Sequence, residues 1–148
     1  MSALNSYSAQ QKICSGGGRN MLEIGTICAE AGEKKTGWLE IEGGGQKLPL
    51  TLICGAKEGP TMMISAGVHG AEYIGVQALS ELSRELDSRE LKGNVICIHV
   101  ANPSAFRDYV RFFVPEDGKN LNRVFPGKKD GTLSERIAWT ITEKLQSK

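Results

Sequence analysis

Two apolar runs with a helical pattern between them place the strongest constraint on the fold of this sequence. Residues 61–66 form a short apolar run typical of a buried strand, and residues 73–87 carry apolar side chains at helical spacing. A second apolar run covers residues 94–100. Strand, helix and strand in this order predict a βαβ unit with parallel strands. We therefore expect an α/β fold with a mixed, mainly parallel sheet flanked by helices.

The part of the sequence before this unit has a different pattern. Residues 22–29, 38–42 and 48–54 are strand-like pieces separated by glycine-rich turns, which predicts an amino-terminal antiparallel meander. The run Gly43-Gly44-Gly45 is not followed by the GxxxxGK[ST] pattern of a phosphate loop. We expect a hairpin turn there and no nucleotide site.

One end of the sequence is predicted to be flexible and the other to form a helix. Residues 1–20 mix Ser, Gln, Asn and Gly with few apolar side chains, so we expect a flexible tail followed by one domain over residues 21–148. Near the other end, Thr132 and Glu135 have the spacing of a capping box that opens a helix. Its apolar face would need a sheet to cover it. We also expect the chain to expose apolar surface and to self-associate. That face comprises Leu133, Ile137, Ala138, Ile141 and Leu145.

Between the first strand and helix of the βαβ unit lies the turn Gly67-Val-His-Gly-Ala-Glu72. It places an imidazole, His69, and a carboxylate, Glu72, three residues apart where ligands bind in open α/β sheets. Catalytic zinc commonly takes two His and one Glu and keeps a position open for water. A bare His-x-x-Glu is a weak motif, but its place at a strand-to-helix turn favours two ligands of a Zn²⁺ site.

A long segment without periodicity, residues 102–131, is typical of a functional loop. It contains Asn122 and Arg123, whose amide and rigid guanidinium suit recognition of a carboxylate. The alternative is a solvated turn with an ordinary surface arginine. The remaining histidine, His99, lies in an apolar strand, and we interpret it as a strand-end residue and not as a ligand.

Composition excludes several classes of partner. The 148 residues carry 18 basic and 17 acidic side chains, a net charge of +1, which predicts neither nucleic-acid nor membrane-surface binding. No stretch has the pattern of a signal peptide or of a membrane span, so we expect a cytoplasmic protein. Cys54 and Cys97 lie in apolar runs and are predicted to be small core residues.

Three motifs in this order resemble the succinylglutamate desuccinylase/aspartoacylase family of the zinc carboxypeptidase-like superfamily. They are Gly67-Val-His-Gly-Ala-Glu-Tyr73, Val100-Ala-Asn-Pro-Ser-Ala-Phe106 and Asp117-Gly-Lys-Asn-Leu-Asn-Arg-Val-Phe-Pro-Gly127. The resemblance runs from about residue 22 to the end. It implies a zinc-dependent amide hydrolase that acts on N-acyl amino acids or related small carboxylate-bearing amides.

The resemblance also implies roles for single residues. His69 and Glu72 match the first two zinc ligands, and Asn122 and Arg123 match the pair that binds the substrate carboxylate. Arg111 resembles the arginine that polarises the scissile carbonyl, although Arg107 is nearby.

Two departures from the family pattern stand out. The family usually has Asp-Leu-Asn-Arg where this sequence has Asn120 in place of the Asp, which removes a carboxylate from that hydrogen-bond network. The family also takes its third zinc ligand from an Asp-x-His motif, and its general-base Glu, from a region beyond residue 148. The chain therefore resembles the amino-terminal part of such a domain, a truncated zinc carboxypeptidase-like fold.

We weigh three functions. Deacylation by the parent protein is the leading hypothesis. The alternative is an inactive fragment or a non-catalytic module that binds small carboxylates. A serine hydrolase ranks third because the sequence has no GxSxG nucleophile elbow.

Overall fold

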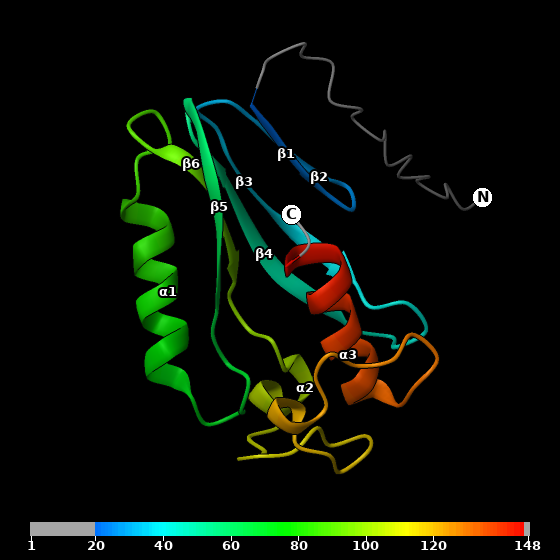
Figure 1. Ribbon diagram of the computed structural model, residues 1–148. Coiled ribbons are helices and arrows are strands. Elements are labelled where there is room, and N and C mark those ends of the chain that lie inside the picture. Colours follow the sequence, from blue (N-terminus) through cyan, green and yellow to red (C-terminus); the bar gives the residue numbers. More distant parts are fainter. Residues whose placement is uncertain (1–19, 147–148) are drawn as a thin grey trace, which may run out of the picture.

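A four-stranded mixed sheet forms the centre of the protein (Figure 1), in the strand order β3-β4-β6-β5. The computed structural model describes residues 20–146. The strands are β3 (Lys34–Glu40), β4 (Lys47–Cys54), β5 (Lys57–Ser65) and β6 (Lys92–Ile98). The β3–β4 and β4–β6 pairings are antiparallel, and the β5–β6 pairing is parallel.

The predicted βαβ unit is confirmed as β5, α1 (Tyr73–Glu85) and β6. The strand and helix boundaries differ from the predicted ones by a few residues. The α/β class and the mixed sheet are also confirmed. Within residues 20–146 the parallel share of the sheet is smaller than predicted, because only β5 and β6 are joined by a crossover helix whereas β3 and β4 form a hairpin.

The amino-terminal meander contains one more turn than predicted. Residues 22–29, predicted as a single strand, fold into a hairpin of β1 (Met21–Ile24) and β2 (Ile27–Glu30). Gly25 adopts φ +60°, a left-handed conformation that allows the two-residue turn between these strands. The turn predicted at Gly43–Gly45 is confirmed, since these glycines lie in the connection between β3 and β4.

Each face of the central sheet is covered by a different layer. In Figure 1, α1 lies on one side of the sheet, and α3 (Leu133–Ile141) and the β1–β2 hairpin lie on the other. Successive side chains of a strand point to opposite faces of the sheet, so neighbours such as Ile96 and Cys97 belong to different hydrophobic clusters. The cluster on the α3 side is the larger one and includes Leu50, Leu52, Ile96, Ile98, Ile137, Ala138 and Ile141.

The apolar face of the final helix is therefore covered. Ile137 and Ala138 are fully buried, and Ile141 is 3% exposed. After α3 the chain continues into a π-helical turn, η2 (Thr142–Gln146), in which Leu145 is also buried. The hairpin and the sheet cover this helix, so the predicted exposed apolar surface is not found there. It is found on β5 and α1, where Met62 is 60% and Ile74 is 89% exposed. Cys54 and Cys97 are buried free thiols, as predicted.

A long loop crosses one end of the sheet between β6 and α3. It contains only α2 (Pro103–Arg107) and the 3-10 turn η1 (Leu121–Arg123), which confirms the predicted irregular segment. The predicted tail lies outside the described residues except for Asn20, whose side-chain amide donates to the Gly55 carbonyl at 2.7 Å. Within the part of the chain that is described, no helix combines the length and apolar character needed to cross a membrane.

Candidate metal and carboxylate site

The turn between β5 and α1 is shaped by its glycines. A Cβ atom at Gly70 would collide with the backbone carbonyl oxygens of Ala105 and Val110. Glycine at this position therefore allows the turn to pack directly against α2 and the residues that follow it. This contact holds the turn and the long loop together at one end of the sheet.

His69 and Glu72 face each other across this turn. His69 Nδ1 lies 2.8 Å from Glu72 Oε1, and the His69 backbone N–H donates to Glu72 Oε2 at 3.1 Å. The His69 side chain is 20% exposed and that of Glu72 is 47% exposed. Neither is packed in the core, so both are accessible to a ligand.

Asn120 holds the other side of the His69 ring. Its Oδ1 lies 3.0 Å from His69 Nε2 and also accepts the Asn122 backbone N–H at 3.0 Å. The second bond fixes the amide orientation, because only the oxygen can accept from a backbone N–H. The asparagine that departs from the family pattern therefore keeps a hydrogen bond to the imidazole, with a neutral oxygen in place of a charged one.

These contacts raise the pKa of His69. The hydrogen bond with Glu72 is the largest cause, partial burial opposes it, and the bond with Asn120 adds to it. Both ring nitrogens face acceptors, so the doubly protonated imidazolium satisfies both bonds in the absence of metal. Burial raises the pKa of Glu72, but hydrogen bonds from His69 outweigh it and the net pKa is lowered.

The pair is close to the spacing of two zinc ligands. Tetrahedral zinc with bonds near 2.0 to 2.2 Å would place two donor atoms about 3.4 Å apart. Nδ1 and Oε1 are 2.8 Å apart, so a small side-chain rotation and loss of the Nδ1 proton would open a site for zinc. Among residues 20–146 no group of three His, Cys, Asp or Glu side chains is placed to hold a metal. These residues thus fit part of a zinc site.

Arg111 and His69 both lie against the ring of Phe112. The Phe112 ring meets His69 edge-on with the centroids 5.9 Å apart, and the Arg111 guanidinium carbon lies 5.4 Å from the Phe112 centroid. Arg107, the other candidate, is held by Asp108 at 2.8 Å. Of the two arginines, Arg111 is therefore the one that shares a contact residue with His69.

Asn122 and Arg123 lie on η1, next to Asn120. Both are exposed. Arg123 is close enough for its charge to oppose the raised pKa of His69. For the guanidinium of Arg123 we find no hydrogen bond or ion pair with any other residue in the described range, so it is available to an anion. The predicted metal ligands and the predicted carboxylate pair are brought to one place.

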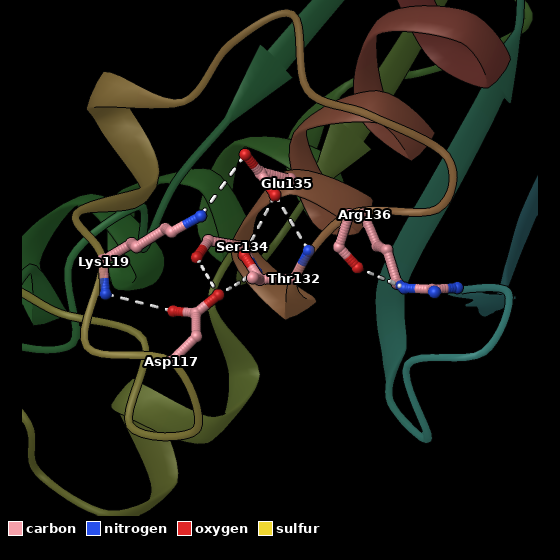
Figure 2. A network of polar contacts seen from close by, with 7 residues as sticks. Asp117, Lys119, Thr132, Ser134, Glu135 and Arg136 are labelled. Atoms are coloured by element: carbon pink, nitrogen blue, oxygen red, sulfur yellow. Dashed lines mark hydrogen bonds and ion pairs between the residues drawn. The ribbon is translucent and has the colours of Figure 1, made fainter.

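Polar contacts tie this loop to the start of α3, as Figure 2 shows. Asp117 Oδ2 accepts the Ser134 backbone N–H at 2.8 Å and also the Ser134 hydroxyl. Lys119 and Glu135 form an ion pair at 3.3 Å. Glu135 also accepts the Thr132 backbone N–H at 2.9 Å, which confirms the bond that the predicted capping box requires from the glutamate. Residues 117 and 119 thus anchor the chain just before Asn120.

Sequence reasoning missed the structural role of Asn102. It is fully buried, its backbone N–H donates to the Gly67 carbonyl at 2.9 Å, and its side chain accepts the Ala105 N–H at 3.3 Å. It therefore joins the turn that carries His69 and Glu72 to α2. The signal was present, because Asn followed by Pro is typical of a helix N-cap.

A groove of about 570 Å³ runs between β5 and α1 and reaches the site at one end. Gly67, Ala71 and Glu72 line that end, and apolar side chains line most of the rest. His99 lies elsewhere, directly after the end of β6. Its Nε2 is 2.7 Å from the Oγ1 atom of Thr51 on β4, and burial lowers the pKa of His99. The interpretation of His99 as a strand-end residue is confirmed.

Comparison with known proteins identifies the family of this chain. Residues 58–148 match the model of the succinylglutamate desuccinylase/aspartoacylase catalytic domain. The chain belongs to this family. The resemblance inferred from the three motifs is thereby confirmed, as is the amino-terminal position of the match.

Three relatives illustrate the relationship. The N-alpha-acetyl-L-2,4-diaminobutyric acid deacetylase of Halomonas elongata is 40% identical over 102 residues, covering 69% of this chain and 29% of the relative. The succinylglutamate desuccinylase of Pseudomonas paraeruginosa is 34% identical over 100 residues, covering 66% and 29%. The crystal structure of an aspartoacylase family protein from Mesorhizobium loti superposes with a TM-score of 0.70 at 37% identity, covering 77% and 37%.

Two facts about these family members bear on function. Both curated relatives are deacylating enzymes by name. The chain spans only 29% of the length of each of them.

Proposed function

We propose that the catalytic domain to which this chain contributes is a zinc-dependent deacylase for N-acyl amino acids. The observation that carries the proposal is the contact between His69 and Glu72 at 2.8 Å, beside an arginine with no partner in the described range. Metal ligands and a carboxylate-binding cation at one end of a sheet suit hydrolysis of an amide that bears a carboxylate.

The residues of this chain would have separate roles in the reaction. His69 Nδ1 and Glu72 would hold zinc, and the Asn120 oxygen would keep the proton of His69 on Nε2. A zinc ion held there supplies a Lewis acid for the scissile carbonyl and a bound water of lowered pKa. Arg111, next to Phe112, would stabilise charge that develops on the carbonyl oxygen.

Asn122 and Arg123 would select the substrate class. A guanidinium binds a carboxylate through two parallel hydrogen bonds, and a neighbouring amide can add a third. The names of the two curated relatives refer to an acetylated diaminobutyric acid and a succinylated glutamate, both of which are acylated amino acids with a carboxylate. Binding that group fixes the amide relative to the metal ligands.

A second candidate concerns the chain by itself. With no third ligand group among residues 20–146, these residues alone would hold zinc weakly. By itself the chain would then be an inactive carboxylate-binding module, and activity would need the rest of the domain.

Kinetics in a protein that carries the whole catalytic domain test the proposal. Arg123→Ala should raise KM for an N-acetyl or N-succinyl amino acid about tenfold or more while the domain stays folded, because the clamp binds the substrate carboxylate. The matched control is Arg89→Ala, an exposed arginine paired with Asp87 away from the site. Unchanged KM in the Arg123 variant would remove the clamp. Absence of hydrolysis with zinc supplied would overturn the proposed activity.

A further inference from the structure

The two residues of the proposed carboxylate clamp, Asn122 and Arg123, lie on a very short element. η1 is a single turn of three residues, and both side chains are exposed. Its own hydrogen bonds are few: the Arg123 N–H donates to the Asn120 carbonyl at 2.9 Å, and the Val124 N–H donates to the Leu121 carbonyl at 3.3 Å. A single 3-10 turn with so few bonds does not hold its orientation alone. The position of the clamp therefore depends on what holds the chain on either side.

Before η1, one carboxylate joins the loop to α3 (Figure 2). Asp117 Oδ2 accepts the Ser134 backbone N–H at 2.8 Å and the Ser134 hydroxyl, and Asp117 Oδ1 accepts the Lys119 backbone N–H at 3.0 Å. Ser134 is fully buried. Its N–H lies in the first turn of α3, where helical N–H groups have no partner within the helix. Asp117 supplies that partner and at the same time fixes Lys119, directly before Asn120.

After η1, the backbone itself lies on α3. A Cβ atom at Gly127 would collide with the Trp139 backbone nitrogen and the Glu135 carbonyl oxygen, so glycine is needed for this contact. The Lys128 N–H donates to the same Glu135 carbonyl at 3.0 Å. The chain is therefore held against α3 on both sides of η1.

Between these two anchors, one side chain of η1 enters the core. Leu121 is fully buried and belongs to the same hydrophobic cluster as Ile137 and Ala138 of α3. Asn122 and Arg123 follow it with exposed side chains. α3 thus forms a support on which the clamp is presented to solvent.

We propose that Asp117 and Ser134 are positioning residues for the clamp. Their contact sets the orientation of Asn122 and Arg123, and thereby the affinity for the substrate carboxylate, without touching the substrate. The role in substrate binding rests on the proposed function, whereas the ordering of η1 requires no activity.

Backbone NMR relaxation of the 148-residue chain tests the ordering. In Asp117→Ala and in Ser134→Ala, the order parameters of residues 121–124 should fall from about 0.85 toward about 0.6, while those of β4 stay unchanged. Ser134→Ala removes only a hydroxyl, so it decides the test if Asp117→Ala does not fold.

The matched control for this measurement is Asp87→Ala. Asp87 Oδ1 also accepts the N–H of the second residue after it, Arg89, at 2.9 Å, but it follows α1 on the other face of the sheet. This variant should leave the order parameters of residues 121–124 unchanged. Unchanged values in Ser134→Ala as well would overturn the proposal.

Kinetics in a protein that carries the whole catalytic domain test the role in binding. Asp117→Ala and Ser134→Ala should each raise KM for an N-acetyl amino acid about threefold or more and change kcat less than about twofold. The value of kcat is preserved because His69 keeps its own bonds with Glu72, at 2.8 and 3.1 Å. Loss of kcat with unchanged KM would overturn the proposal.

A background that lacks the clamp separates positioning from a general structural role. When Asn122→Ala and Arg123→Ala are already present, Ser134→Ala should not change kcat/KM further, because the side chains that it orients are absent. Ile53→Val, in the buried cluster on the other face of the sheet, lowers stability and should leave KM unchanged.

The outcomes of the kinetic test are distinct. A further loss of kcat/KM from Ser134→Ala in the background without the clamp, or an equal rise of KM in Ile53→Val, would overturn the positioning role. Absence of hydrolysis in the wild-type domain would overturn the proposed function, and the order parameters would still decide whether Asp117 and Ser134 order η1.

Discussion

Strands β4 and β5 both pair with β6, yet they differ in how completely they are covered. The last five residues of β4 are all buried, whereas no residue of β5 is fully buried. Both contain an apolar run. An apolar run therefore predicts a strand, but its burial depends on which other elements lie against it. Within residues 20–146, other elements cover β4. By contrast, β5 borders the groove and leads into the turn that carries the candidate metal ligands.

The contrast predicts where stability originates. Leu52→Ala on β4 removes a fully buried side chain and should lower the free energy of unfolding by about 2 to 5 kcal/mol. Met62→Ala on β5 changes an exposed side chain and should cost at most about 0.5 kcal/mol. Urea denaturation of the two variants measures both values. Equal losses would show that β5 is as well packed as β4.

A smaller effect is expected at the tether between the loop and α3. Asp117→Asn should destabilise the chain by about 1 to 3 kcal/mol at neutral pH, because charged hydrogen bonds to the buried Ser134 are lost. Asp130→Asn, on an exposed aspartate, is the control. Thermal unfolding compares the two variants, and equal midpoints would contradict the tether.

The pH dependence of this tether has a definite sign. Burial raises the pKa of Asp117, but hydrogen bonds from Ser134 outweigh it and leave the net pKa lowered. A carboxyl with a lowered folded-state pKa stabilises above its unfolded value of about 3.9 and loses this contribution as the pH falls through the folded value. The gap between wild type and Asp117→Asn should therefore shrink below about pH 4.

The smallest effect concerns the pKa values of the two histidines. His69 lies in the turn after β5, and His99 contacts Thr51 on β4. In the metal-free chain, His69 should titrate above and His99 below the ordinary value of about 6.5, since Glu72 stabilises the charged form of His69 and burial disfavours that of His99. Proton NMR with EDTA present follows both rings. Glu72→Gln should lower the pKa of His69 alone. A common pKa for both rings would contradict the described contacts.

The sequence predicted the parts of the fold that depend on local patterns. Hydrophobic periodicity indicated β5, α1 and β6, and the capping residues Thr132 and Glu135 marked the start of α3. The extra hairpin was missed because Gly25 sits inside an otherwise continuous apolar run, where a turn and a strand look alike. The strand order of the central sheet, with β5 at one edge, was not predicted, because strand order depends on contacts between distant residues.

The candidate site was predictable to a similar extent. The strand-to-helix turn indicated His69 and Glu72, the long loop indicated Asn122 and Arg123, and the resemblance to the family assigned their roles. The structure brings them to one end of the sheet. The contact between Asn120 and His69 was not foreseen, because a side-chain amide at that position is informative only when its partner is known. Their roles in binding metal and substrate remain predictions.

The most direct test of the account is a calorimetric zinc titration of the 148-residue chain, with and without the remainder of the catalytic domain. With only two candidate ligands in the described residues, the chain alone should show no stoichiometric binding at micromolar zinc, and the completed domain should bind one zinc tightly. His69→Ala should abolish the tight binding. Tight one-to-one zinc binding by the chain alone would contradict the account, because it would mean that residues 1–148 already hold a complete metal site.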